Sequence, residues 1–214
     1  SIKNFYLTHK FVTNSIDNYR SEKLSFLNRF NTKRQIKNLR ILHITNFNER
    51  LDGRLFFNTG RRINNGFIRL GHSVLEFSDR DITHNHKNYT DMSGSKILNK
   101  KLQKTCDNFS PDMIVLGHAD LIHRETLNEI KLKYPNIKIA QWFLDPLVKK
   151  GPDYDKNKKR ILDKMDYVDK NFLTTSPNVL NFLDKNKNFF IPNPSDPSFE
   201  TLNNFKKKCH YDVF

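Results

Sequence analysis

Residues 112–117, "DMIVLG", carry the clearest fold signal in the sequence. Four consecutive apolar residues lie between an aspartate and a glycine, which is typical of a short strand buried on both faces of a parallel sheet. An apolar stripe at helical spacing precedes it in residues 95–109, and Pro111 ends that stripe. A second helical pattern follows in residues 124–134. The stretch therefore predicts a central strand between two helices.

The same alternation extends in both directions along the chain. Further strands are predicted at residues 39–44, 73–78, 137–144, 170–176 and 188–193, and further helices at residues 54–70, 155–168 and 177–185. Strands that alternate with helices favour a parallel sheet covered on both faces. The sequence therefore predicts an α/β fold, a Rossmann-like doubly wound parallel sheet of about six strands.

Two details of this pattern lead to specific expectations. Gly66 lies inside the helix predicted at residues 54–70, where glycine costs about 1 kcal/mol relative to alanine. We expect it to permit close packing of that helix on the sheet. Residues 81–91, "DITHNHKNYTD", predict a polar loop in which His84 and His86 are solvated.

The chain is basic, with 37 Lys and Arg against 23 Asp and Glu among 214 residues, and a formal net charge of +14. Half of that charge lies in residues 1–40. Such a charge is found in proteins that bind nucleic acid, anionic membranes or anionic substrates, and it also follows simply from a composition rich in Lys and Asn. We predict a basic N-terminal extension over residues 1–37 and a Rossmann-like domain over 38–197.

The location and the metal content are predicted from what the sequence lacks. It contains no run of 18 or more apolar residues and no apolar leader. We therefore expect a cytoplasmic protein, and contact of its basic extension with the inner face of a membrane stays open. Cys106 and Cys209 have no metal-type spacing and the eight histidines form no metal cluster, so we predict no metal site. We also predict no cofactor.

Candidate site residues follow from the rule that open α/β sheets bind ligands beyond the carboxyl ends of their strands. Polar residues stand at every such position. Asp, Asn, Ser and Thr also cap the helices that begin there, so the capping explanation stays open for each of them. They are Thr45, Asn46, Asn48, Asp79, Asp81, His118, Asp120, Asp145, Thr175, Ser176 and Asn193.

The loop after the first strand, "TNFNERLDG" (45–53), is long and leads through Arg54 and Asn58 into a helix. A helix N-terminus beside arginines can hold an anion. The glycine spacing matches neither a dinucleotide fingerprint nor a P-loop. This loop therefore predicts anion or substrate contacts rather than nucleotide hydrolysis.

His118 ends a hydrophobic strand, where it can act as a general base near neutral pH or simply bond to the backbone. There is no nucleophile elbow, and neither cysteine follows a strand. Proton transfer, rather than covalent catalysis, is the chemistry that these residues allow.

As an ordered set, three segments resemble the N-terminal half of two-domain GT-B glycosyltransferases, the CgeB-like spore-maturation enzymes in particular. They are "NGFIRLGHSV" (65–74), "PDMIVLGHADLIHRETLNEIKLKYPNIKIAQWFLDPL" (111–147), and "FLTTSPNVLNFL" with "NFFIPNPSDP" (172–183 and 188–197). The resemblance covers residues 38–214. It implies that residues 198–214 are a hinge with the first strand, "YDVF" (211–214), of a missing C-terminal domain that carries the nucleotide-sugar site.

The resemblance implies the acceptor-binding half of a glycosyltransferase, inactive without its donor half. Its partners would be a nucleotide-sugar donor, bound by the missing domain, and a saccharide or other hydroxyl acceptor. The resemblance places an aspartate after the Trp-bearing strand, so Asp145 is the first candidate base and His118 the second, although Pro146 suggests that Asp145 only shapes a turn. Candidate substrate contacts are Asn46, Asn48, Arg54, Asn58, Asp120, Ser176 and Asn193.

Two other functions remain open. One is a non-catalytic Rossmann-like module that binds a small ligand or an anion. The other is a nucleic-acid-binding protein, which needs basic residues interleaved with aromatic residues on one face, and "RFNTKRQIK" (29–37) is the only such stretch in the sequence. Because that stretch lies outside the predicted sheet, we expect no nucleic-acid partner.

Overall fold

The computed structural model describes residues 37–200 of the chain. The chain divides into two units after Lys37, and every helix and strand named below belongs to the unit that begins at Asn38. The basic extension predicted at residues 1–37 lies outside the described residues except for Lys37. The strand predicted at residues 211–214 lies outside them as well.

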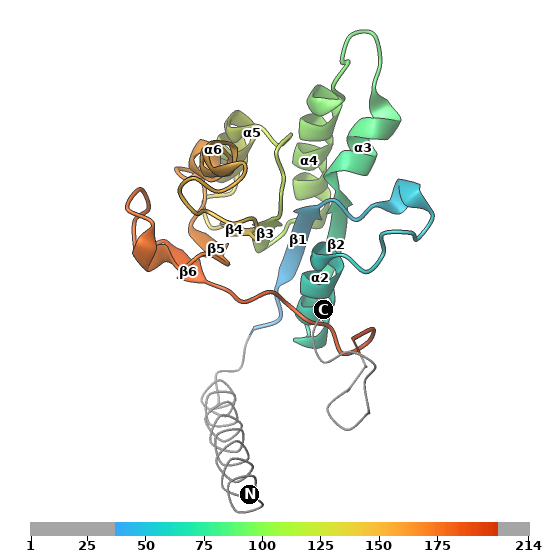
Figure 1. Cartoon of the computed structure of the whole chain (residues 1–214). Coiled ribbons are helices and arrows are strands. Elements are labelled where there is room, and N and C mark those ends of the chain that lie inside the picture. Colours follow the sequence, from blue (N-terminus) through green and yellow to red (C-terminus); the bar gives the residue numbers. More distant parts are fainter. Residues whose placement is uncertain (1–36, 201–214) are drawn as a thin grey trace, which may run out of the picture. The chain divides into compact units, whose positions relative to one another are not determined.

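Six parallel strands form one sheet in the order β2-β1-β3-β4-β5-β6 (Figure 1). Each strand begins within one residue of its predicted start, and the predicted α/β Rossmann-like fold is confirmed. The strands are β1 (Arg40–Thr45), β2 (Ser73–Ser78), β3 (Met113–Leu116), β4 (Lys138–Phe143), β5 (Lys170–Leu173) and β6 (Asn188–Phe190).

Five α-helices connect the strands within the described residues, and they cover both faces of the sheet. Ile63 and Phe67 of α2 pack on one face, against Val115 and Trp142. On the other face α4 and α5 bury an aliphatic core against β1, β3 and β4, and α6 packs Ile161 beside Phe143 and Leu173. The helices are α2 (Thr59–Arg69), α3 (Asp79–His86), α4 (Ser95–Phe109), α5 (Arg124–Lys133) and α6 (Tyr154–Lys164), with 3₁₀ turns η1 (Glu49–Leu51) and η2 (Pro177–Val179).

Two secondary-structure predictions were wrong. Residues 79–86 form helix α3, so His84 and His86 lie on a helix rather than in a loop. The helix predicted at residues 177–185 is only the 3₁₀ turn η2. In the second case the apolar side chains Leu180 and Leu183 are buried beside Phe143 without a helix.

The strand order reverses between β1 and β3, because the chain continues from β1 to β2 on one side and from β3 to β4 on the other. The side chain of Thr45, at the end of β1, lies where the strand order reverses. A Cβ at Gly60 would lie 2.6 Å from its Cγ2, and one at Gly117 would lie 2.5 Å from its Oγ1. These two glycines therefore let α2 and the end of β3 close on Thr45. The expectation for Gly66 was wrong, because a Cβ there would meet nothing within 4 Å.

Beyond β6 the chain crosses back to α2 (Figure 1). Asp196 anchors it there, fully buried, and accepts hydrogen bonds from Asn65 Nδ2 at 2.7 Å and Arg69 Nη2 at 2.6 Å. The bond from Arg69 holds the pKa of Asp196 well below its usual range. The crossing segment is therefore pinned to the helix and is not a free linker.

The face that carries α2 is incompletely covered by the described helices. An apolar groove of about 590 Å³ lies beside α2, and Val115, Trp142 and Phe172 contribute to its lining. No helix among residues 37–200 has both the length and the apolar character needed to cross a membrane.

Candidate functional site

The structure brings together the two residues that the sequence proposed as bases. His118 follows β3 and Asp145 follows β4, and these strands are neighbours in parallel register. Nε2 of His118 lies 3.7 Å from Oδ2 of Asp145. Because that distance exceeds a hydrogen bond, an incoming hydroxyl group can sit within reach of both atoms.

Two arginines complete a set of charged side chains at this edge. Nη1 of Arg160, from α6, lies 3.6 Å from Oδ2 of Asp145, and its Nη2 lies 3.0 Å from Oδ2 of Asp120. Nη2 of Arg80, from α3, lies 3.7 Å from the same Asp120 oxygen. We call His118, Asp120, Asp145, Arg80 and Arg160 the charged cluster. Two guanidinium groups offset two carboxylates, so the cluster holds its charges close together without a large excess of either sign.

His118 is held in a defined orientation within the cluster. Its ring stacks on Phe143, with the centroids 4.9 Å apart and the planes 7° from parallel. Burial lowers the pKa of His118 below its ordinary value of 6.5, while the carboxylates of Asp145 and Asp120 act in the opposite direction. The imidazole is therefore neutral at neutral pH, the form in which it can accept a proton.

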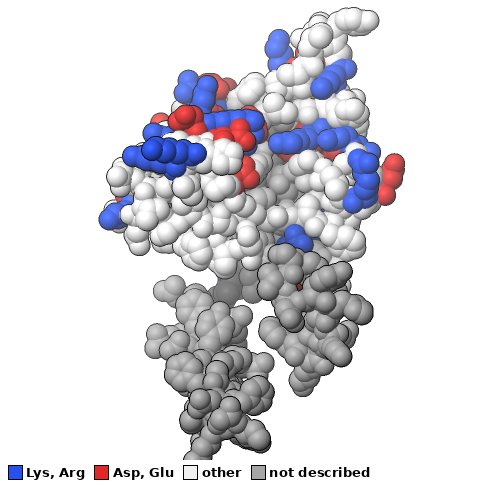
Figure 2. All heavy atoms as spheres, viewed as in Figure 1, with Lys and Arg blue, Asp and Glu red and all other residues white. Residues whose placement is uncertain are grey.

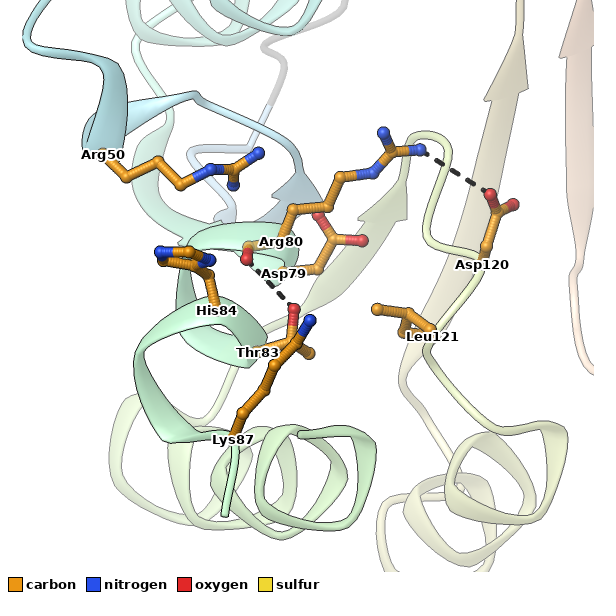
Figure 3. Close-up of a pocket in the computed structure, with 8 residues that line it drawn as sticks. All are labelled: Arg50, Asp79, Arg80, Thr83, His84, Lys87, Asp120 and Leu121. Atoms are coloured by element: carbon orange, nitrogen blue, oxygen red, sulfur yellow. Dashed lines mark hydrogen bonds and ion pairs between the residues drawn. The ribbon is translucent and has the colours of Figure 1, made fainter. Parts of the chain in front are cut away.

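The charged cluster borders a pocket of about 310 Å³, and the two share Arg80 and Asp120. Figure 3 shows α3 supplying one wall of this pocket and the loop after β3 supplying the other. The pocket is lined by Arg50, Asp79, Arg80, Thr83, His84, Lys87, Asp120 and Leu121. A bound molecule could therefore lie next to His118 without entering the protein core.

Three predicted substrate contacts make hydrogen bonds within the protein. Asn46 Nδ2 donates to Asn48 Oδ1 at 2.9 Å, and Asn48 N donates back to Asn46 Oδ1 at 3.2 Å. Asn58 caps α2, because its Oδ1 accepts from the backbone N of Arg61 at 2.9 Å. These bonds account for the three asparagines as loop and cap residues, and a substrate role for them stays a prediction.

The remaining predicted contacts are placed differently. Asp120 belongs to the charged cluster. Arg54 is exposed in the loop that leads to α2. Ser176 precedes η2 after β5, and Asn193 is exposed after β6, the edge strand of the sheet. The structure thus gathers His118, Asp120 and Asp145 into one cluster but not the other predicted residues.

Sequence reasoning missed both arginines of the charged cluster. Arg160 is the last residue of the basic run at residues 158–160, and nothing in that run marks which side chain turns toward the sheet. Arg80 lies in the segment that was predicted to precede a loop. In Figure 2, basic and acidic side chains gather in a band across the upper part of the molecule, where both signs lie side by side.

No group of three or more His, Cys, Asp or Glu side chains suited to a metal ion occurs within residues 37–200. The chemistry available at the cluster is proton transfer at His118 or Asp145, beside arginines that can stabilise negative charge. Comparison of the sequence with protein-family models and with curated proteins gives no match.

Proposed function

We propose that this domain is the acceptor-binding half of a glycosyltransferase and that the charged cluster activates the acceptor hydroxyl. The observation that supports the proposal is the placement of His118 Nε2 and Asp145 Oδ2 3.7 Å apart, at the carboxyl edge of a parallel sheet. The nucleotide-sugar donor would bind to a second domain, as the resemblance to GT-B enzymes implies.

The reaction requires a group that takes up a proton. When the acceptor oxygen forms its bond to the anomeric carbon, the bond from that carbon to the phosphate oxygen breaks and the hydroxyl proton must leave. His118 Nε2 takes that proton, and Asp145 stabilises the imidazolium that results. A positioned base contributes about 10²–10⁴-fold to the rate.

The cellular setting belongs to the same proposal. We place the protein in the cytoplasm, where nucleotide sugars are available, with its basic N-terminal residues against the anionic inner face of the membrane.

The proposal is tested in the complete protein that contains this chain. Release of nucleoside diphosphate from a panel of nucleotide sugars is measured with and without hydroxyl acceptors. We expect His118→Gln to lower kcat/KM by about 10²–10⁴-fold. The matched control is His86→Gln, because His86 is exposed on α3 and its Nδ1 lies 2.8 Å from the backbone oxygen of Ile82.

The pH profile separates the two candidate bases. If His118 takes the proton, wild-type activity falls as the pH drops through its lowered pKa, and Asp145→Asn keeps that dependence at a reduced rate. Transfer by His118→Gln at the wild-type rate would refute the assignment.

A further inference from the structure

Asp79, on the pocket beside the charged cluster, is the starting point for a further inference. It is the first residue of α3 and only 1% exposed. Neither of its carboxylate oxygens has a hydrogen-bond partner among the described residues. In Figure 3 its carboxyl group lies beneath the side chain of Arg80, on the side that faces Leu121.

An unpartnered buried carboxylate is unusual in a folded protein, because buried polar groups are nearly always hydrogen-bonded. Its own amide and that of Arg80 lie close enough to favour the ionised form, but neither completes a hydrogen bond. Ser78 and Asp81, its neighbours in sequence, are by contrast both hydrogen-bonded. The Asp79 carboxylate therefore needs a hydrogen-bond donor that the described part of the chain does not supply.

The pocket also carries positive charge. Lys87 is exposed and has no ion-pair partner among residues 37–200. Arg80 approaches Asp120 no closer than 3.7 Å, so its guanidinium donors are not committed to that carboxylate. Arg50 differs, because its Nη1 already binds Asp81 Oδ1 at 2.8 Å. Arg80 and Lys87 are thus the two cations that can receive an anion.

We propose that this pocket binds a small polyhydroxylated anion, with a hydroxyl group donating to Asp79 and a phosphate or carboxylate group held by Arg80 and Lys87. Both the hydroxyl group and the anionic group of such a molecule are needed. An anion alone would face the Asp79 carboxylate without a donor for it, and a neutral polyol would leave both cations unpaired. A volume of about 310 Å³ lies at the lower end of the range for small-molecule sites, about 300–1,000 Å³.

Within the proposed function, on which this part of the inference rests, the bound anion is the acceptor or its terminal unit. The charged cluster shares Arg80 and Asp120 with the pocket. A second hydroxyl of the same molecule can therefore lie beside His118 while the first is held by Asp79.

The test is calorimetry at pH 7.5 with three probes: glycerol 3-phosphate, glycerol, and sulfate, which is an anion without a hydroxyl group. We expect glycerol 3-phosphate to bind at least ten-fold more tightly than either of the others. Equal affinity for glycerol 3-phosphate and sulfate would overturn the proposal, because the hydroxyl groups would then contribute nothing.

Two variants separate the two halves of the pocket. Asp79→Ala removes the acceptor and should weaken binding of glycerol 3-phosphate by about ten-fold or more without weakening the binding of sulfate. Lys87→Gln should weaken both anions and leave glycerol unchanged, and Lys100→Gln, an exposed lysine of α4, is its control. Asp79→Leu, which is of similar size and has no acceptor atom, provides a second variant if the alanine variant does not fold. Unchanged affinity in the folded Asp79 variants would overturn the proposal.

Different experimental results would refute the proposed ligand class and the proposed function. His118 does not line the pocket, so His118→Gln should keep the preference for glycerol 3-phosphate and lose only glycosyl transfer. Absence of transfer by the wild-type protein from every nucleotide sugar tested, with the binding preference intact, would refute the transferase role and leave the ligand class standing. Lack of a preference for glycerol 3-phosphate in wild-type protein that still transfers sugar would refute the ligand class and leave the transferase role standing.

Discussion

His43 is a buried histidine whose two ring nitrogens both have partners. Its Nε2 accepts a hydrogen bond from Nε1 of Trp142 at 3.2 Å, so its Nδ1 carries the proton and donates to Asn64 Oδ1 at 3.1 Å. Burial lowers the pKa of His43 to about 4, although the bond to Asn64 acts the other way. Protonation would place a charge in the core and break the bond from the indole.

His43 therefore makes the folded state sensitive to acid. The unfolded chain takes up a proton near pH 6.5 and the folded chain only near pH 4, so this contribution to stability is lost as the pH falls through that window. The loss amounts to about 3 kcal/mol at most. In urea unfolding at pH 7 and pH 4.5, His43→Gln should lose less stability on acidification than wild type. An equal loss in both proteins would contradict the lowered pKa.

Asp79 should have the opposite effect on stability over nearly the same range. Burial raises the pKa of Asp79 to about 6 from an ordinary value of 3.8. The folded state therefore binds a proton before the unfolded state does, and stability increases as the pH falls from about 6 toward 4, by about 3 kcal/mol at most. Asp79→Asn should be at least as stable as wild type at pH 7 and should lose the gain at low pH. A gain of wild-type size in this variant would show that another group titrates.

His118 and Asp145 were predictable because each directly follows an apolar strand, and because strands that are consecutive in the sequence are often neighbours in a sheet. Their partner Arg160 was not predictable. Its position on α6 depends on how that helix is rotated against β4 and β5, which a run of basic residues does not reveal.

Among the elements, α3 shows why a helix can be missed. Its buried side chains are Asp79, Asp81 and Thr83, all of them polar. A hydrophobic period is the main sign of a helix in a sequence, and here the face that is buried has none. The strands were predictable, because both of their faces are apolar over most of the sheet. Each strand was predicted to within a few residues.

Gly117 follows β3 and lies against side chains of β1 and β4. A methyl group there would lie 2.5 Å from Thr45 Oγ1 and 2.6 Å from Trp142 Cζ2. Gly117→Ala should therefore lower the free energy of unfolding by about 1–3 kcal/mol. Gly66→Ala is the matched control, because a methyl group at that helical position meets nothing, and it should raise stability by up to about 1 kcal/mol. Chemical denaturation measures both, and equal effects would contradict the packing described at Thr45.

For the whole molecule, the uneven charge leads to a prediction about membranes. Half of the net charge of +14 lies in residues 1–40, and each Lys or Arg near an anionic bilayer is worth about 1 kcal/mol. The full chain should sediment with vesicles of anionic phospholipid at low salt and be released at high salt. A chain that begins at Asn38 should bind much more weakly, and vesicles of neutral phospholipid are the control. Equal binding by both chains would refute a role for the extension.

Trp142 is the one tryptophan of the chain, and its position makes it an optical reporter. Its ring centroid lies 6.2 Å from that of His43 and 6.2 Å from that of His118. A protonated imidazole quenches the fluorescence of a nearby indole. Since His43 takes up its proton only toward pH 4, quenching that begins at higher pH should follow His118, and His118→Gln should remove it. An acceptor that hydrogen-bonds to His118 would then shift the midpoint, so the emission of one side chain would reveal binding without any label.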